Sequence, residues 1–74
     1  MIDVQQELRD LAAAQQHIAQ GRSRIRRQID LIRELRRDGH DVEQALQLLA
    51  ALRQSLDAQR MHKNVIVEVI NDAV

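Results

Sequence analysis

The sequence predicts an all-α fold: an antiparallel helical hairpin that dimerises into a four-helix bundle. The 74 residues include no proline and only two glycines, a composition that suits long uninterrupted helices. Apolar residues recur every seven positions on both sides of one short polar segment, as they do in coiled coils. That segment, residues 36–44, contains the residue types that end one helix and begin the next.

Composition limits both the size and the chemistry of this fold. A chain of this length forms one domain, predicted as residues 1–74, near the lower limit at which a single core supports a fold. Phe, Tyr, Trp and Cys are absent, so aliphatic residues must supply the buried surface, and disulfides and thiolate metal sites are excluded. The 11 basic and 11 acidic side chains balance. With no secretory signal and no bilayer-length apolar run, we expect a soluble cytoplasmic protein that does not enter the membrane.

The first helix is predicted over residues 3–38. Asp3 is placed to cap its first turn, and one core position repeats every seven residues. That position contains Val4, Leu11, Ile18, Ile25 and Ile32. The second core position is predicted to contain Leu8, Gln15, Arg22, Ile29 and Arg36. Gly21, inside the helix, marks either a kink, a close approach of the two helices or an incidental exposed position.

A turn is predicted over residues 39–41. Gly39 can adopt the left-handed conformation that closes a helix, and His40 belongs to the turn. Asp41 can accept hydrogen bonds from the first free N–H groups of the second helix. Gln44 follows three residues later and completes an approximate capping box.

The second helix is predicted over residues 42–71 and also follows a heptad pattern. Its two core positions contain Val42, Leu49, Leu56, Lys63 and Ile70, and Ala45, Leu52, Gln59, Ile66 and Ala73. Folding the chain about the turn brings the two patterns into phase, so that Ile25 faces Leu56. Residues 65–70 are β-branched except for Glu68, so a strand or a frayed tail is the alternative to helix there.

Four polar residues fall together in the middle of the predicted seam. This polar core layer consists of Gln15, Arg22, Gln59 and Lys63. In one interpretation, the long side chains lay their stems on the seam and send their polar ends to solvent. In the other, the layer fixes the register or the oligomeric state of the helices. The sequence leaves both interpretations open.

Several leucines remain outside the predicted seam. The candidate dimer or partner surface consists of Leu31, Leu35, Leu46 and Leu48. Burial on so wide an arc requires more than one neighbouring helix. A two-fold homodimer would cover these leucines as a four-helix bundle, and a different protein partner would cover the same surface.

The segment from Arg22 to Arg37 has a local charge of +5, which suits phosphate or an acidic partner. The candidate anion or nucleic-acid patch consists of Arg24, Arg26, Arg27, Arg33 and Arg37. These arginines are scattered around the helix, and Arg26 and Arg37 stand at ion-pair spacing from Asp30 and Glu34. No aromatic residue is present to stack on a base. We therefore expect weak binding, or none, to generic nucleic acid.

No catalytic, cofactor-binding or metal-binding residue is predicted. His17, His40 and His62 lack the spacing and the accompanying carboxylate of a helical zinc site. Ser23 and Ser55 have no positioned base in a recognisable motif, and the chain has no glycine-rich phosphate loop. We expect a protein that is not an enzyme.

The middle of the chain resembles a group of short, uncharacterised helical proteins of alphaproteobacteria. The resemblance covers residues 11–66, and its most distinctive string is Arg37-Asp38-Gly39-His40-Asp41. This chain has Val42 after the turn, where the group usually has threonine. The resemblance implies a two-helix fold and no established activity, so it assigns no site residues. At the level of architecture the chain is also similar to Rop-type hairpin dimers, which bind RNA, although a shared fold does not imply a shared function.

Together these observations favour a small homodimeric interaction protein that acts as an adaptor, regulator or inhibitor by binding another protein. A Rop-like hairpin that binds RNA or DNA through Arg22 to Arg37 is the alternative. A mobile-element inhibitor of a larger host complex, or a purely structural coiled coil, is a third possibility. The sequence does not identify the partner.

Overall fold

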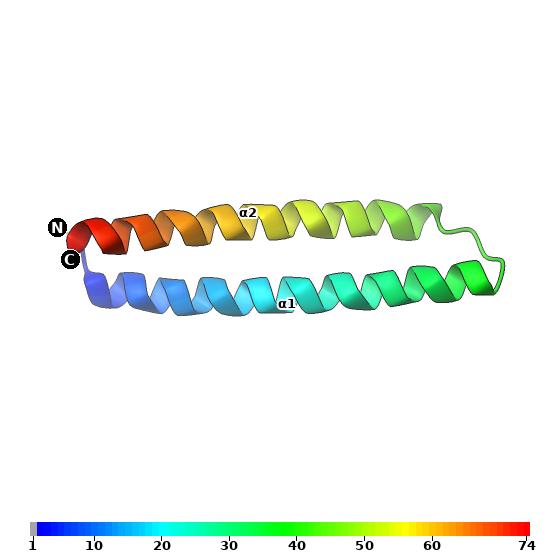
Figure 1. Ribbon diagram of the computed structural model, residues 1–74, viewed down its shortest axis with the longest axis horizontal. Coiled ribbons are helices and arrows are strands. Elements are labelled where there is room, and N and C mark those ends of the chain that lie inside the picture. Colours follow the sequence, from blue (N-terminus) through cyan, green and yellow to red (C-terminus); the bar gives the residue numbers. More distant parts are fainter. Residues whose placement is uncertain (1) are drawn as a thin grey trace.

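The computed structural model describes residues 2–74 as two long antiparallel helices joined by a tight turn (Figure 1). Helix α1 spans Val4–Arg37 and helix α2 spans Glu43–Ala73, and the molecule measures 57 × 14 × 12 Å. Both termini lie at the end opposite the turn (Figure 1). The predicted helical hairpin is therefore confirmed, and each helix ends within two residues of its predicted bounds. Residue 1 of the predicted domain lies outside the described residues.

The first turn of α1 is capped as the sequence predicts. Asp3 has an extended backbone, and its Oδ1 accepts a hydrogen bond from the backbone N–H of Gln6 at 3.3 Å. Glu7 adds a negative charge in the first turn, where the helix dipole favours it. The hydrogen bond to the Asp3 carboxylate therefore helps to determine where α1 begins.

Gly39 closes α1 in the left-handed conformation, with φ of 77°. The backbone N–H of Gly39 donates to the carbonyl of Arg36 at 3.1 Å, and that of His40 donates to the carbonyl of Leu35 at 2.8 Å. These two bonds form a Schellman motif, which satisfies carbonyls that the end of the helix would otherwise leave free. The predicted role of Gly39 is confirmed.

Asp41 caps α2 by a different geometry from the predicted one. The N-cap residue is Val42, which provides no side-chain hydrogen bond, and Oδ1 of Asp41 accepts from the backbone N–H of Glu43 at 3.0 Å. Asp41 thus lies one residue before the N-cap. The hydrogen bonds found among residues 2–74 include none from the side chain of Gln44, so the predicted capping box with Gln44 is wrong.

The seam of α2 follows the predicted positions, with Leu49, Leu56 and Ile66 buried. The second core position of α1 lies one residue earlier than predicted. Ala14 and Gln28 are 5% and 8% exposed, whereas Gln15 and Arg22 are exposed to solvent. Residues three and four positions after a core residue lie on the same helix face, so either can be the second core position. The apolar Leu8 and Ile29 favoured the later position, whereas the structure buries the earlier one.

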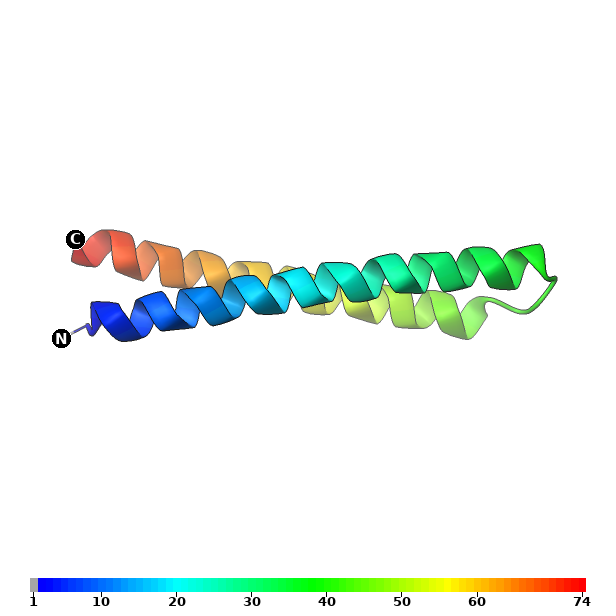
Figure 2. The ribbon, with the colours of Figure 1, turned by 90° about the horizontal axis from the view of Figure 1, so that it is seen from below.

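Helix α2 continues through the β-branched residues 65–70 and ends at Ala73. Ile66 is buried against α1, while Val65 is exposed. The helical prediction is correct here, and the strand or frayed tail is not formed. In the view of Figure 2 the two helices cross at a shallow angle near the middle of the hairpin. Because Ile66 packs in the seam, tertiary packing overrides the strand propensity of the β-branched residues 65–70.

Candidate interaction surfaces

The predicted polar core layer is not a continuous layer in the structure. Gln15 and Arg22 lie outside the seam, and Gln59 and Lys63 are half-buried within it. Gln59 faces Gly21, since a Cβ built on Gly21 would lie 3.1 Å from Oε1 of Gln59 and 3.4 Å from Cδ1 of Leu56. Gly21 therefore marks a close approach of the two helices. The Oε1 atom of Gln59 is buried and has no hydrogen-bond partner among residues 2–74.

Gln28 is a buried polar residue that was not predicted from the sequence. Its Nε2 donates to the carbonyl of Ala45 at 2.9 Å, so it ties the turn-proximal half of α1 to the first turn of α2. Gln28 lies seven residues after Gly21 and fourteen after Ala14 in the corrected core position. This seven-residue spacing could have identified the core position of Gln28, but Ala14, Gly21 and Gln28 are small or polar and do not stand out in a hydrophobic pattern.

An apolar groove runs along one side of the hairpin near the turn. It is lined by Arg24, Arg27, Gln28, Leu31, Leu48 and Leu52. Leu31 and Leu48 are 43% and 50% exposed, although both are large and apolar. The structure therefore brings together two of the four leucines predicted as a dimer or partner surface.

The other two leucines of that predicted surface lie elsewhere. Leu35 is half-buried, seven residues after Gln28 in the corrected core position. Leu46 is exposed but does not line the apolar groove. Leu46 and Leu48 are two residues apart on one helix, so they face different directions. The four leucines therefore do not form one patch.

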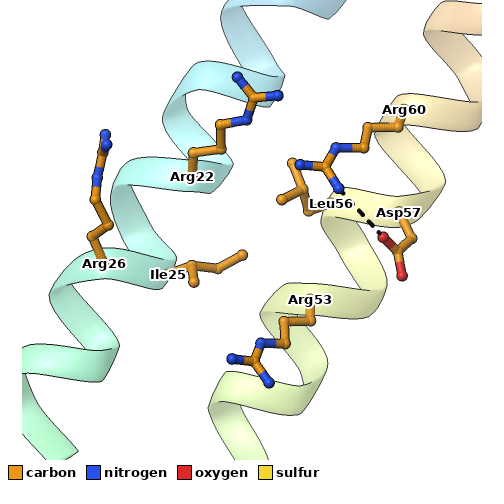
Figure 3. A pocket seen from close by; sticks show the side chains of 7 residues that line it. All are labelled: Arg22, Ile25, Arg26, Arg53, Leu56, Asp57 and Arg60. Carbon is orange, nitrogen blue, oxygen red and sulfur yellow. Dashed lines mark ion pairs between the residues drawn. The ribbon is translucent and has the colours of Figure 1, made fainter.

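A basic groove occupies the middle of the hairpin and is formed by both helices (Figure 3). It is lined by Arg22, Ile25, Arg26, Arg53, Leu56, Asp57 and Arg60, and has a volume of about 480 Å³. Ile25 and Leu56 extend into the space between the helices, with Arg22 and Arg60 on one side of them and Arg53 on the other, while the Arg26 side chain extends away from α2 (Figure 3). A second hollow beside it shares Arg22 and Arg60 and adds Ile18 and Lys63. The combined surface is strongly cationic with an apolar floor.

Arg53 and Arg60 were not predicted as part of the basic surface, because only the arginines of the first helix are close together in the sequence. These two arginines are seven residues apart, and each follows a core leucine by four positions. That spacing places them beside the seam, on the side where Arg22 also lies. The flanking positions of both helices were therefore the signal for this groove.

The predicted anion patch is divided by the fold. Arg26 lies in the basic groove, whereas Arg24 and Arg27 line the apolar groove. Arg33 and Arg37 form ion pairs with Asp30 and Asp38, at 3.7 and 3.5 Å.

The expected pairs of Arg26 with Asp30 and of Arg37 with Glu34 are not formed, since Asp30 pairs with Arg33 and Arg37 pairs with Asp38. Arg60 pairs with Asp57 at 3.9 Å, and these three ion pairs are the only ones among residues 2–74. Arg22, Arg26 and Arg53 therefore face the groove without an acidic partner.

His17, His40 and His62 are all exposed. Over the described part of the chain, no group of three or more His, Cys, Asp or Glu residues is placed to hold a metal ion. Neither α1 nor α2 contains a stretch that is long and apolar enough to cross a membrane, as far as residues 2–74 extend.

Comparison of the chain with protein-family models, with curated proteins and with solved structures finds no match. The two-helix architecture implied by the resemblance to short alphaproteobacterial proteins is present, but the comparisons identify no family. The surfaces must therefore be interpreted from their own geometry. The hairpin is an antiparallel pair of helices with an apolar groove near the turn and a basic groove in the middle.

Proposed function

We propose that this chain is a non-enzymatic interaction protein, a homodimer of helical hairpins that acts as an adaptor, regulator or inhibitor by binding another protein. The observation that carries the proposal is the apolar groove with Leu31 and Leu48 on its surface. Large leucines that remain half-exposed in a folded chain indicate a surface that a partner covers. The cytoplasmic location expected from the sequence stays a prediction.

The small core supports this proposal. Among residues 2–74, no large side chain is completely buried, because a pair of helices covers each seam residue from one side only. A second hairpin packed on the apolar groove would add the missing layer, as in a four-helix bundle. Burial contributes roughly 25 cal/mol per Å² of apolar surface, so covering two leucines on each copy stabilises the assembly by several kcal/mol.

The charges beside the groove are arranged to match a second copy. Arg24, Leu31 and Asp38 are spaced seven residues apart, and Arg27 and Glu34 are also seven apart, on either side of Leu31. A two-fold axis near Leu31 would bring Arg24 and Arg27 of one copy against Asp38 and Glu34 of the other. Such an isologous contact is self-complementary in both shape and charge. The occupant that the groove fits best is therefore another copy of this chain.

Light scattering measures this association directly. At tens of micromolar we expect a mass of twice 8.5 kDa for the wild-type protein. Leu31→Glu with Leu48→Glu should give a folded monomer, because it places charges in the contact. Leu8→Glu with Leu46→Glu is the matched control, since these leucines are 44% and 40% exposed but lie outside the apolar groove. A wild-type mass of 8.5 kDa at these concentrations contradicts the homodimer.

Charge reversal tests the predicted orientation of the two copies. Arg27→Glu alone should weaken dimerisation by about tenfold, since it replaces two exposed attractive contacts by repulsive ones. Arg27→Glu combined with Glu34→Arg should restore it, because the pattern is inverted on both copies. If the double variant is as weak as the single one, the two helices do not meet in this orientation.

The nucleic-acid alternative has weaker support than a protein partner. Its predicted patch is divided between two grooves and two ion pairs with acids close by in the sequence, and the chain contains no aromatic residue for base stacking. Nucleic acid is therefore included as a competitor in the binding experiment below.

A further inference from the structure

We infer that the basic groove is the docking site for an acidic amphipathic helix of a partner protein. This inference rests on the proposal that the chain acts by binding a protein, and it assigns the chemistry of that partner. The groove is formed by Arg22, Arg26, Arg53 and Arg60 around an apolar floor of Ile25 and Leu56 (Figure 3).

The shape of the groove fits a helix. Two antiparallel helices leave a long furrow between them, and a third helix packs into such a furrow in helical bundles. The basic groove and the adjoining hollow extend along α1 from Gln15 to Arg26. At a rise of 1.5 Å per residue this is about 16 Å, or three helical turns. Ile25, which is half-buried, and the aliphatic stems of the arginines provide the apolar contacts for the partner, since Ile18 is already buried in the seam.

The charge of the groove requires an acidic occupant. Flanking positions of facing helices usually carry opposite charges, but here both helices contribute arginine. Arg22, Arg26 and Arg53 have no ion pair within residues 2–74, and the single acid of the groove, Asp57, is paired with Arg60. A second copy with the same groove facing this one would place arginine against arginine. Carboxylates from a different protein would provide the missing partners.

The apolar floor distinguishes a helix from a nucleic acid. Leucine or isoleucine side chains of an amphipathic helix would cover the half-buried Ile25 and the aliphatic stems of the arginines, above Leu56, which is already buried in the seam. A phosphate backbone is charged and hydrated, and it gives the floor no apolar contact. The observations therefore favour an acidic helix with apolar residues on its inner face.

Titration with synthetic peptides tests the inference. The probe is a helical peptide of about three heptads, with leucine on one face and glutamate beside it, and the control peptide has glutamine in place of glutamate. We expect the glutamate peptide to bind more tightly than the control and to weaken as salt is added. Arg22→Glu with Arg26→Glu should weaken the glutamate peptide by about tenfold or more.

Arg33→Glu with Arg36→Glu is the matched control variant. It makes the same change of charge on the same helix but lies outside the groove, so peptide affinity should change much less. Circular dichroism and light scattering on each variant verify that the helices and the dimer are retained. Asp57→Asn removes the one negative charge of the groove and should tighten binding, a gain that loss of folding cannot imitate.

Three results would overturn the inference. Equal affinity for the glutamate and glutamine peptides, or no binding of either, would show that the groove does not select an acidic helix. If light scattering still reports a dimer in that case, the proposed function is retained and only this inference is lost. Tighter binding of a single-stranded RNA, abolished by Arg22→Glu with Arg26→Glu, would assign the groove to nucleic acid. A lower mass for that variant would show that a second copy of the chain occupies the groove.

Discussion

Gly21 and Gly39 are the only glycines of the chain, and different physical requirements apply to them. Gly39 has φ of 77° and nothing within 4 Å of where a Cβ would lie, so only its backbone conformation favours glycine. Gly21 is an ordinary helical residue whose missing side chain lets Gln59 and Leu56 come close. Gly39 is favoured by its backbone conformation, and Gly21 lies where the two helices come close.

Replacing each glycine by alanine separates these two effects. Gly39→Ala should lower the free energy of unfolding by about 1 kcal/mol, because the left-handed conformation is unfavourable for any residue with a Cβ. Gly21→Ala should raise it by about 0.5–1 kcal/mol, because alanine has the higher helix propensity and the flexible Gln59 side chain can shift away. Urea denaturation of both variants measures the difference. Destabilisation by Gly21→Ala would show that Gln59 cannot move.

At the scale of the helices, the core positions of α2 could be predicted from the sequence more completely than those of α1. The seam of α2 could be predicted because large apolar residues such as Leu49 and Leu56 occupy it. The second core position of α1 could not, because Ala14, Gly21 and Gln28 contribute small or polar side chains there. Hydrophobic spacing locates a helix face to within about one residue, and close packing of small residues then decides the register.

The same limit applies to the candidate surfaces. The position of the turn and the role of Gly39 were predictable because they depend on local backbone chemistry, although Asp41 lies one residue before the N-cap and forms no capping box with Gln44. The grooves depend on which side of the seam each flanking residue of both helices occupies. The one-residue error in the predicted seam placed Arg22 in the core, whereas the structure places it at the rim of the basic groove. The basic groove could therefore not be derived from either helix alone.

The corrected seam predicts different effects of leucine at Gln59 and at Arg22. Gln59→Leu should raise the free energy of unfolding by about 1 kcal/mol, because it removes a buried oxygen that has no hydrogen-bond partner among the described residues. Arg22→Leu should change it by no more than about 0.5 kcal/mol, since Arg22 is exposed at the groove rim. Thermal and urea unfolding measure both. A larger gain for Arg22→Leu than for Gln59→Leu would contradict the corrected register.

At the scale of the whole molecule, a net charge of zero conceals an uneven distribution. Residues 22–27 and 53–63 contain seven cations and one acid, whereas the turn and the termini carry more acids than cations. The middle of the hairpin is therefore basic and both ends are acidic. This division separates the two proposed contacts, since the apolar groove lies toward the turn and the basic groove lies in the middle.

The proposed dimer also predicts how stability depends on concentration. If folding and association are coupled, a hundredfold increase in protein concentration stabilises the dimer by about 2.7 kcal/mol, which raises Tm by roughly 5–10 °C for a dimer of two such chains. Calorimetry over such a range should show this shift for the wild-type protein and for Leu8→Glu with Leu46→Glu. Leu31→Glu with Leu48→Glu should melt at one temperature throughout, because its apolar groove no longer binds a second copy. A wild-type Tm that does not change with concentration would mean that each hairpin folds alone, with Leu31 and Leu48 left exposed.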